Sequence, residues 1–243
     1  PVGLIFWRTF ENGLAPVIDG LTTQATIHAF QLTAVIAFWA VLANTVFGVV
    51  AALLLVRYDF RGKRVLNALI DLPLAVSPVI VGLSLILVYG RTTGIGQALA
   101  GIGIGIIFSI PGMVMATIFV SIPLVVRAVA PVLEEIGDDQ EQAARTLGAG
   151  PVQTFRRITL PSIRGALAYG VVLAAARSLG EYGAVAVVSG RLVGRTQTVT
   201  LLVQERYLNF DQETAYACAL LLVVTAVLAL GVSRLLAPKE IKR

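Results

Sequence analysis

DDQEQAARTLGAGPVQTFRRITLP, residues 138–161, is a polar stretch between long apolar segments, and the rest of the chain is arranged around it. Asp138 is expected to cap a helix, with Glu141 as the acidic half of a capping box three residues later. Glycine commonly follows the last turn of a helix, so Gly148 is expected to end this one. The stretch is too short for a soluble domain and too well punctuated for a linker.

A second short helix is predicted in the same stretch. Gly150 and Pro151 indicate its start, because proline fits the first turn of a helix, and Pro161 indicates its end. Two short helices at a sharp bend would form a knob that another protein could grip.

The composition is that of a membrane-embedded protein. Hydrophobic residues make up 57% of the chain and mean hydropathy is +0.85, whereas charged residues make up 14%, against about 25% in soluble domains. The net charge is +5, but the basic residues form short clusters between apolar runs, so no nucleic-acid partner is expected. The single cysteine, Cys218, excludes an internal disulfide. We expect one all-α domain, residues 1–243, of transmembrane helices in contact with lipid.

Five stretches are long and apolar enough to cross a bilayer, which needs about 20 residues per helix. They are residues 27–56, 65–89, 106–126, 166–188 and 215–236. The chain begins at Pro1, and residues 4–7 look like the end of an earlier helix rather than a signal peptide. The expected fold is a polytopic bundle of about six transmembrane helices, the first one truncated.

Counts of lysine and arginine predict the orientation of this bundle. Thirteen lie within residues 57–64 and 127–164 and in the C-terminal segment after residue 233, against five on the opposite side. Cytoplasmic segments carry the excess of basic residues, so residues 138–161 and the C-terminus are expected in the cytoplasm. Residues 94–105 and 189–212 are then expected outside, the former as a loop or a shallow re-entrant piece.

Prolines and glycines interrupt two of the stretches, at Pro73, Pro78, Gly82, Pro111, Gly112 and Pro123. Each proline removes a backbone hydrogen bond and invites a kink. In a membrane such a break is tolerated where protein or water satisfies the freed carbonyls, so these positions either line a pathway or serve helix packing. Both interpretations stay open, and Pro78 and Pro123 are the candidates for a translocation path.

Arg177 and Glu181 fall inside the fourth apolar stretch, four residues apart and therefore on one helical face. Burying either charge alone in hydrocarbon costs several kcal/mol, so they are expected to face each other, a partner helix or a wet cavity. A functional role in the path and a structural pairing are both open. Gly180 and Gly183 would allow a close approach or a kink beside the pair.

No catalytic or metal-binding cluster is visible elsewhere. His28 is the only histidine and has no partner at ligand spacing, so no metal site is expected. No nucleophile stands beside a base, and the glycine-rich run at 101–105 lacks the features of a nucleotide-binding loop. A transporter that concentrates its substrate would therefore draw energy from another polypeptide that grips residues 138–161.

The spacing within the polar stretch resembles a known motif. Gln142-Ala143-Ala144, three residues, Gly148, nine residues and then Ile158-Thr159-Leu160-Pro161 resemble the EAA loop of importer-type ABC transporter permeases, whose pattern is Glu-Ala-Ala, x3, Gly, x9, Ile-x-Leu-Pro. Gln142 is the one departure, and neighbouring Glu141 is its candidate substitute in an ionic contact. The resemblance implies an importer-type permease fold in which this loop is a coupling helix that docks into a groove of an ATP-binding subunit.

The coupling residues that this resemblance implies lie on both sides of the bend. We expect Leu147 and Phe155 to insert into the groove of the ATP-binding subunit, and the small side chains of Ala143 and Ala144 to permit its close approach. The full set is Glu141, Gln142, Ala143, Ala144, Leu147, Gly148, Phe155, Ile158, Leu160 and Pro161.

The resemblance extends over nearly the whole chain. Residues 71–83, 108–123 and 176–198 look like sulfate/thiosulfate permease subunits of the CysW type and less closely like molybdate permeases. In that family the subunit pairs with a homologous second permease, two ATP-binding subunits and an external sulfate-binding protein in a prokaryotic cytoplasmic membrane. ATP and Mg²⁺ would be bound by the ATPase, so no cofactor is expected on this chain.

Three alternatives remain at this point. Gly180-Glu181-Tyr182-Gly183 is shared with the molybdate branch, so import of molybdate or tungstate is the alternative within the class, although residues 187–190 (VVSG) favour sulfate. A polytopic membrane enzyme would need a catalytic constellation, which is not visible. A scaffold without a transport role would fail to co-purify with an ATPase.

Overall fold

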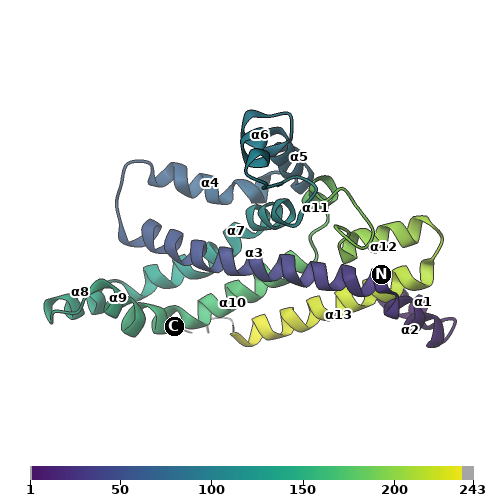
Figure 1. Ribbon diagram of the computed structural model, residues 1–243. Helices are drawn as coiled ribbons and strands as arrows, with labels where there is room; N and C mark the ends of the chain where they lie inside the picture. The colour runs from purple at the N-terminus through teal and green to yellow at the C-terminus, as the bar shows by residue number, and fades with distance from the viewer. Residues whose placement is uncertain (1, 237–243) are drawn as a thin grey trace.

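The computed structural model describes residues 2–236, and within this range every regular element is helical. Four long helices run along one another as a bundle (Figure 1): α3 (Gln24–Arg57), α7 (Ile110–Ile136), α10 (Leu160–Leu179) and α13 (Gln212–Leu236). α7 packs between α3 and α10, and α10 also packs along α13. The expected all-α membrane fold is confirmed.

Glycines let the long helices approach closely. Gly48 of α3 faces Val125 of α7, where an added Cβ would lie 2.5 Å from Val125 Cγ1. Gly170 of α10 meets Ala128 of α7 in the same way, with 2.9 Å to the Ala128 Cβ. Because lipid tails are as apolar as leucine, close packing at small residues is what favours contact between helices over contact with lipid.

The number of possible membrane crossings within residues 2–236 agrees with the five predicted stretches, although some of their bounds differ. In this range four helices are long and apolar enough to cross a bilayer: α3, α7, Pro151–Leu179 and Gln212–Ala229. A fifth crossing can be formed by two helices joined at a sharp bend, α4 (Lys63–Ala75) and α5 (Pro78–Tyr89). The sixth predicted helix falls at α1 (Val2–Phe10), which has 9 residues in this chain.

The predicted second span, residues 65–89, is two helices rather than one kinked helix. α4 and α5 meet at an angle of 115°. The break lies at Ser77, whose backbone is extended (φ −59°, ψ 133°), and Pro78 then starts α5. The residue before a proline is disfavoured in the helical region, which explains why α4 ends here. Pro73 by contrast is accommodated inside α4.

Two other predicted spans need correction. α7 begins at Ile110 and continues to Ile136, so Pro111 and Gly112 lie in its first turn and do not interrupt it. The predicted fourth span, residues 166–188, is broken: α10 ends at Leu179 and a separate short helix, α11 (Gly183–Val188), follows. α11 packs against α5 and α7 rather than extending α10.

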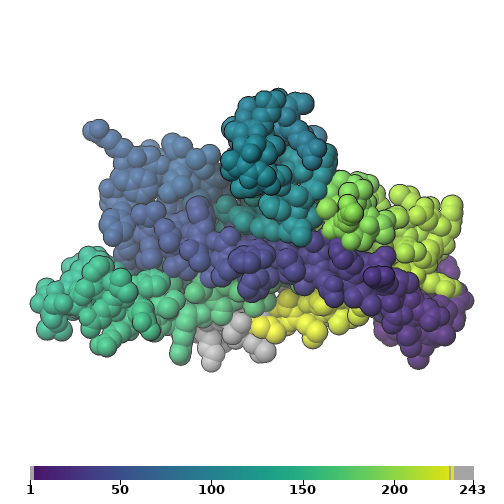
Figure 2. Space-filling view, viewed as in Figure 1, coloured from purple at the N-terminus to yellow at the C-terminus, as the bar shows by residue number. Residues whose placement is uncertain are grey.

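Short helices occupy the two ends of the bundle (Figure 1). α8 (Asp139–Thr146), α9 (Pro151–Thr154) and the π-helix Phe155–Thr159 lie at one end, and α2 (Ala15–Thr22) and α12 (Val199–Leu208) at the other. α12 lies within the predicted loop 189–212, and α6 (Gly94–Gly101) within the predicted loop 94–105. Figure 2 shows α4 and the α5–α6 region as two projections from one side of the bundle.

The basic residues used to predict orientation are not all in loops. Arg127 and Arg164 lie within α7 and α10. Arg57 is the last residue of α3. In the C-terminal segment, Lys239, Lys242 and Arg243 lie outside the described residues. The placement of α8 and the C-terminus in the cytoplasm stays a prediction.

Candidate functional site

The 138–161 segment forms a knob, and the first helix of this knob, α8, ends as the sequence predicts. Gly148 has φ +86°, a left-handed conformation that glycine adopts without strain. The Gly148 N–H donates to the Arg145 carbonyl at 3.0 Å, and the Ala149 N–H donates to the Ala144 carbonyl at 3.0 Å. These two bonds form a Schellman motif, which satisfies the carbonyls at the end of a helix and fixes the direction of the chain.

Apolar side chains stand out at the tip of this knob. Leu147, the C-terminal cap of α8, is 89% exposed, and Val152 of α9 is 72% exposed. A concavity of about 390 Å³ opens beside Leu147, with Gln153, Arg157 and Ile158 on its other wall. Exposed apolar side chains that gather beside a concavity are a feature of surfaces that bind another protein.

The remaining predicted coupling residues divide into exposed and inward-facing ones. Gln142, Ala143, Gly148 and Pro161 are exposed, whereas Ala144, Ile158 and Leu160 are half-buried. Phe155 is also half-buried and packs against the internal cluster that contains Val129, Leu133 and Ile163. The knob therefore presents Leu147 outward, whereas Phe155 packs partly inside the subunit, and the insertion of either residue into a partner stays a prediction.

Glu141 does not form the predicted capping box. Asp138 makes no side-chain capping bond, and Glu141 is 7% exposed with its side chain turned into the subunit. Its carboxylate accepts hydrogen bonds from Arg57 Nε at 3.2 Å, Arg57 Nη2 at 3.4 Å and Thr159 Oγ1 at 2.8 Å. A charged partner within the fold outcompetes the backbone of the first turn, and a residue so enclosed is not free to replace Gln142 in an ionic contact.

Arg57 completes this network from the end of α3. Besides Glu141, it donates to the Leu133 carbonyl at 2.9 Å and to the Gly137 carbonyl at 2.6 Å, both at the C-terminal end of α7. The side chains of Arg57 and Glu141 are 11% and 9% exposed. We call Arg57, Glu141 and Thr159 the Arg57 clamp. It joins α3, α7, α8 and the π-helix, and no local sequence pattern indicates it, because Arg57 and Glu141 are 84 residues apart.

The second helix of the knob does not end at Pro161. α9 starts after Gly150 as predicted, but it passes through the π-helix into α10, so that Pro161 lies in the first turn of α10. The Leu160 N–H donates to the Phe155 carbonyl five residues back, which marks the wider π turn. Proline has no N–H to donate, and the irregular turn before Pro161 accommodates it without ending the helix.

Arg177 and Glu181 face each other as an ion pair, one of the three arrangements expected, but they do not lie on one helix face. Glu181 lies beyond the end of α10, in the break before α11, and Arg177 Nη1 is 2.6 Å from Glu181 Oε2. Glu181 Oε1 accepts a hydrogen bond from the Ala184 N–H at 2.9 Å, which caps the first turn of α11. The side chain of Glu181 is 2% exposed and that of Arg177 is 38% exposed. The carboxylate therefore joins α10 to α11.

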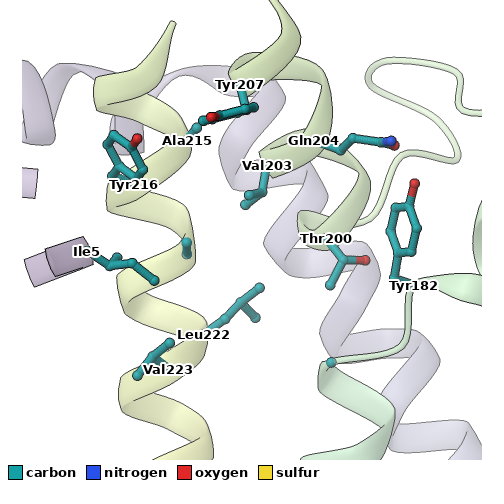
Figure 3. Close-up of a pocket in the computed structure, with 12 residues that line it drawn as sticks. Ile5, Tyr182, Thr200, Val203, Gln204, Tyr207, Ala215, Tyr216, Leu222 and Val223 are labelled. Atoms are coloured by element: carbon teal, nitrogen blue, oxygen red, sulfur yellow. The ribbon is translucent and has the colours of Figure 1, made fainter. Parts of the chain in front are cut away.

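An apolar cavity of about 660 Å³ lies beside this break, between α12 and α13 (Figure 3). Tyr182, Gln204, Tyr207 and Tyr216 line it together with the apolar residues Ile5, Val203, Leu222 and Val223, and its surface is almost entirely apolar. Its residues come from α1, the α10–α11 break, α12 and α13, and no local sequence pattern could group them.

Of the two prolines proposed for a path, Pro78 lies beside this region. A Cβ added at Gly183 would be 3.0 Å from Pro78 Cβ, so the start of α11 packs closely on the start of α5. Pro123 is buried within α7, which continues through it. The structure thus brings Pro78 near Glu181 and leaves Pro123 in the packed interior of the subunit.

A second pair of charges within the apolar helices joins residues that are 56 positions apart, a distance at which no local sequence pattern connects them. Arg127 of α7 donates through Nε to Asp71 Oδ1 of α4 at 2.8 Å, through Nη2 to Asp71 Oδ2, and to Asn67 Oδ1 at 2.9 Å. This bidentate pair holds α4 against α7 and balances both charges.

Comparison with known proteins gives the family. The model of the family described as binding-protein-dependent transport system inner membrane component matches residues 44–242. The chain belongs to this family. This permease is 46% identical over 236 residues to the sulfate transport system permease protein CysW of Synechocystis sp., with 97% of this chain and 86% of that protein covered. It is 37% identical over 230 residues to the sulfate transport system permease protein CysT of Salmonella typhimurium, with 95% and 83% covered.

The fold of the permease is shared with solved transporters. A bacterial alginate ABC transporter, in complex with a periplasmic protein that carries an alginate pentasaccharide, superposes with a TM-score of 0.73 over 97% of this chain and 84% of that chain. Its sequence identity to the permease is 18%, so this likeness shows the fold alone. The predicted importer-permease fold and the CysW-type resemblance are confirmed, whereas the roles of individual site residues stay predictions.

Proposed function

We propose that the permease is the membrane-spanning subunit of an ATP-driven importer of sulfate or thiosulfate and forms half of its translocation path. Its similarity to both CysW and CysT, two proteins named as sulfate permeases, supports the substrate. The same two similarities support a partner, because two homologous chains of this kind can pair to enclose a path between them.

The charges within the apolar helices suit the passage of a dianion without tight binding. Arg127 is paired with Asp71 and Arg177 with Glu181, so neither arginine offers an uncompensated charge. A path that held sulfate tightly would release it slowly. We infer that affinity for the anion resides in an external binding protein, and that a partner of this kind delivers it to the permease.

The observation that carries the coupling part of the proposal is Leu147. It is 89% exposed at the tip of a knob whose backbone direction is fixed by the Schellman motif at Gly148. An apolar anchor presented by a rigid support is what a groove on a partner protein requires. Two ATP-binding subunits would bind ATP and Mg²⁺, and this chain would contribute the docking surface rather than catalytic groups.

In a prokaryotic inner membrane, the proposed coupling requires one orientation of the permease. The knob and the C-terminus face the cytoplasm, where ATP is available, and α12 faces outward, where the binding protein arrives. ATP binding would draw two knobs together and switch the permease pair between inward-facing and outward-facing states.

Leu147→Glu tests the coupling part. The charge would have to be buried in the groove, so we expect at least a tenfold loss of the ATPase from the purified complex and a matching loss of uptake. Leu208→Glu is the control, because Leu208 is 64% exposed at the opposite end of the molecule and should leave the ATPase bound. Normal ATPase association in Leu147→Glu would show that the knob is not the docking surface.

Substrate identity requires a separate measurement. In the purified complex with its binding protein, sulfate should stimulate ATP hydrolysis, and excess thiosulfate should compete for uptake of labelled sulfate. Stimulation by molybdate but not by sulfate would overturn the assignment while leaving the coupling proposal intact.

A further inference from the structure

The Arg57 clamp provides a physical link between the knob and α3, a helix that is distant from the knob in sequence. α7 ends directly before the knob and α10 follows it, whereas Arg57 and Glu141 are 84 residues apart. α8 itself packs mainly on α9 and the π-helix. The ion pair between Glu141 and Arg57 connects α8 to the ends of α3 and α7.

The hydrogen bonds of the clamp make the connection between α8 and the ends of α3 and α7 rigid. Arg57 donates four hydrogen bonds to three residues, and Glu141 receives a fifth from Thr159. A guanidinium presents its donors in a fixed planar fork, so the carboxylate and the two backbone carbonyls are held in one geometry. Because the pair is nearly excluded from water, displacement of α8 relative to α3 would leave buried charges without partners.

We propose that the Arg57 clamp makes α3 move together with the knob and with the end of α7 that precedes it, and that Glu141 is a positioning residue for coupling rather than a contact to the ATPase. This inference rests on the proposed function, because it takes the knob as the point where force enters the permease. Without the clamp, movement of the knob would reach the bundle through α7 and α10, the two helices that are continuous with it, and not directly through α3.

Glu141→Gln and Thr159→Val test the inference in the full complex reconstituted with the binding protein. Glu141→Gln keeps the size of the side chain and an oxygen for Thr159 but directs an amide NH₂ at Arg57. We expect the ATPase to co-purify in wild-type amounts and basal ATP hydrolysis to stay within about twofold, whereas uptake per ATP hydrolysed falls about tenfold or more. Thr159→Val removes one bond of the clamp and should lower the same ratio by a smaller factor, about two- to threefold.

The ratio of uptake to hydrolysis separates positioning from general stability, because a destabilised complex is less abundant but each intact copy is still coupled. Lys63→Gln is the matched control, since Lys63 pairs with exposed Asp59 near the same end of α3 and outside the clamp. It should leave the ratio unchanged. If Glu141→Gln lowers the amount of complex, the milder Thr159→Val supplies the ratio.

The possible outcomes are distinct. Wild-type uptake per ATP in both variants would overturn the inference. Loss of the ATPase from Glu141→Gln, with Thr159→Val fully coupled, would also overturn it, because Glu141 would then be a contact or folding residue. Absence of stimulated hydrolysis in the wild-type complex would instead contradict the proposed function.

Discussion

Glu141 and Glu181 are both buried carboxylates paired with arginine, yet they lie in different surroundings. Glu141 is held by Arg57 through two nitrogens and by Thr159, and its arginine is 11% exposed. Glu181 meets a single nitrogen of Arg177, which is 38% exposed, and its Oε2 receives no aligned hydrogen bond from the described residues. One pair is a closed network at the end of the bundle, and the other is an open pair at a helix break.

Because the two arginines differ in exposure, they would respond differently to the loss of their carboxylate partners. Arg57 is enclosed and would keep an unbalanced charge in the interior, whereas Arg177, whose side chain is 38% exposed, can turn its guanidinium away from the interior. The same Glu→Gln substitution should therefore have unequal effects at the two sites. This contrast fits a rigid attachment at the knob and a looser junction between α10 and α11.

Glu141→Gln should give the largest loss of stability. Removal of one partner of a buried ion pair costs about 3–5 kcal/mol. For a chain of this size about 2–4 °C is lost per kcal/mol, so the Tm of the detergent-purified permease should fall by about 6–20 °C. Thermal unfolding followed by helix content measures it. A Tm within about 2 °C of wild type would show that water reaches Arg57 and that the clamp is not closed.

Gly82→Ala should have the next largest effect on stability, and it tests whether close packing on α5 holds α11 in place. An added Cβ would lie 2.8 Å from the Ala184 carbonyl oxygen and 2.8 Å from Val187 Cβ, so α5 and α11 would have to separate. Such overpacking costs about 1–3 kcal/mol. The control is Gly231→Ala in α13, where an added Cβ would meet no atom of the described residues within 4 Å outside its own stretch of helix, so alanine should be neutral or stabilising. Equal Tm values for the two variants would contradict the close packing of α11 on α5.

Glu181→Gln should cost less than Gly82→Ala, about 1 kcal/mol or less. The amide oxygen can still accept from the Ala184 N–H, and half-exposed Arg177 can find other partners. Glu181→Ala removes that acceptor and should cost about 1–3 kcal/mol, because the N–H of fully buried Ala184 is left unpaired. The difference between the two Tm values separates the contribution of the hydrogen bond to the Ala184 N–H from the contribution of the Glu181 charge. If Glu181→Gln were as damaging as Glu141→Gln, the proposed contrast between the two pairs would be wrong.

Local sequence patterns indicate the Arg177–Glu181 pair but not the Arg57–Glu141 pair. Gly148 alone predicted the end of α8, since a left-handed residue is needed there. The i, i+4 spacing of Arg177 and Glu181 predicted their ion pair, although their placement on one helix was wrong because apolar composition continues through the break at Gly180. Arg57 and Glu141 are 84 residues apart, and local spacing does not connect them.

Two errors within 138–161 have a common cause, which is that a local pattern fits more than one structure. An acidic residue three positions after Asp138 fits a capping box, but Glu141 found a buried arginine instead. Proline fits both the end of one helix and the first turn of the next, and only the contacts of the π-helix decide for Pro161. The long apolar spans were predictable because composition determines them directly, whereas the 115° bend before Pro78 depends on packing.

Lys63→Gln should have the smallest effect and extends the comparison to an exposed pair. Lys63 Nζ is 2.8 Å from Asp59 Oδ1, and the Asp59 side chain is 98% exposed. The hydrogen bond and charge of Lys63 lower the pKa of Asp59 below its ordinary value of about 3.9. A lowered pKa in the folded state gives a contribution to stability that is present above the unfolded pKa and is lost as the pH falls through the folded one. Wild type and Lys63→Gln should differ slightly at neutral pH and converge in acid, and thermal unfolding between about pH 7 and pH 3 measures this. A difference at neutral pH as large as that of Glu141→Gln would mean that enclosure does not set the strength of these ion pairs.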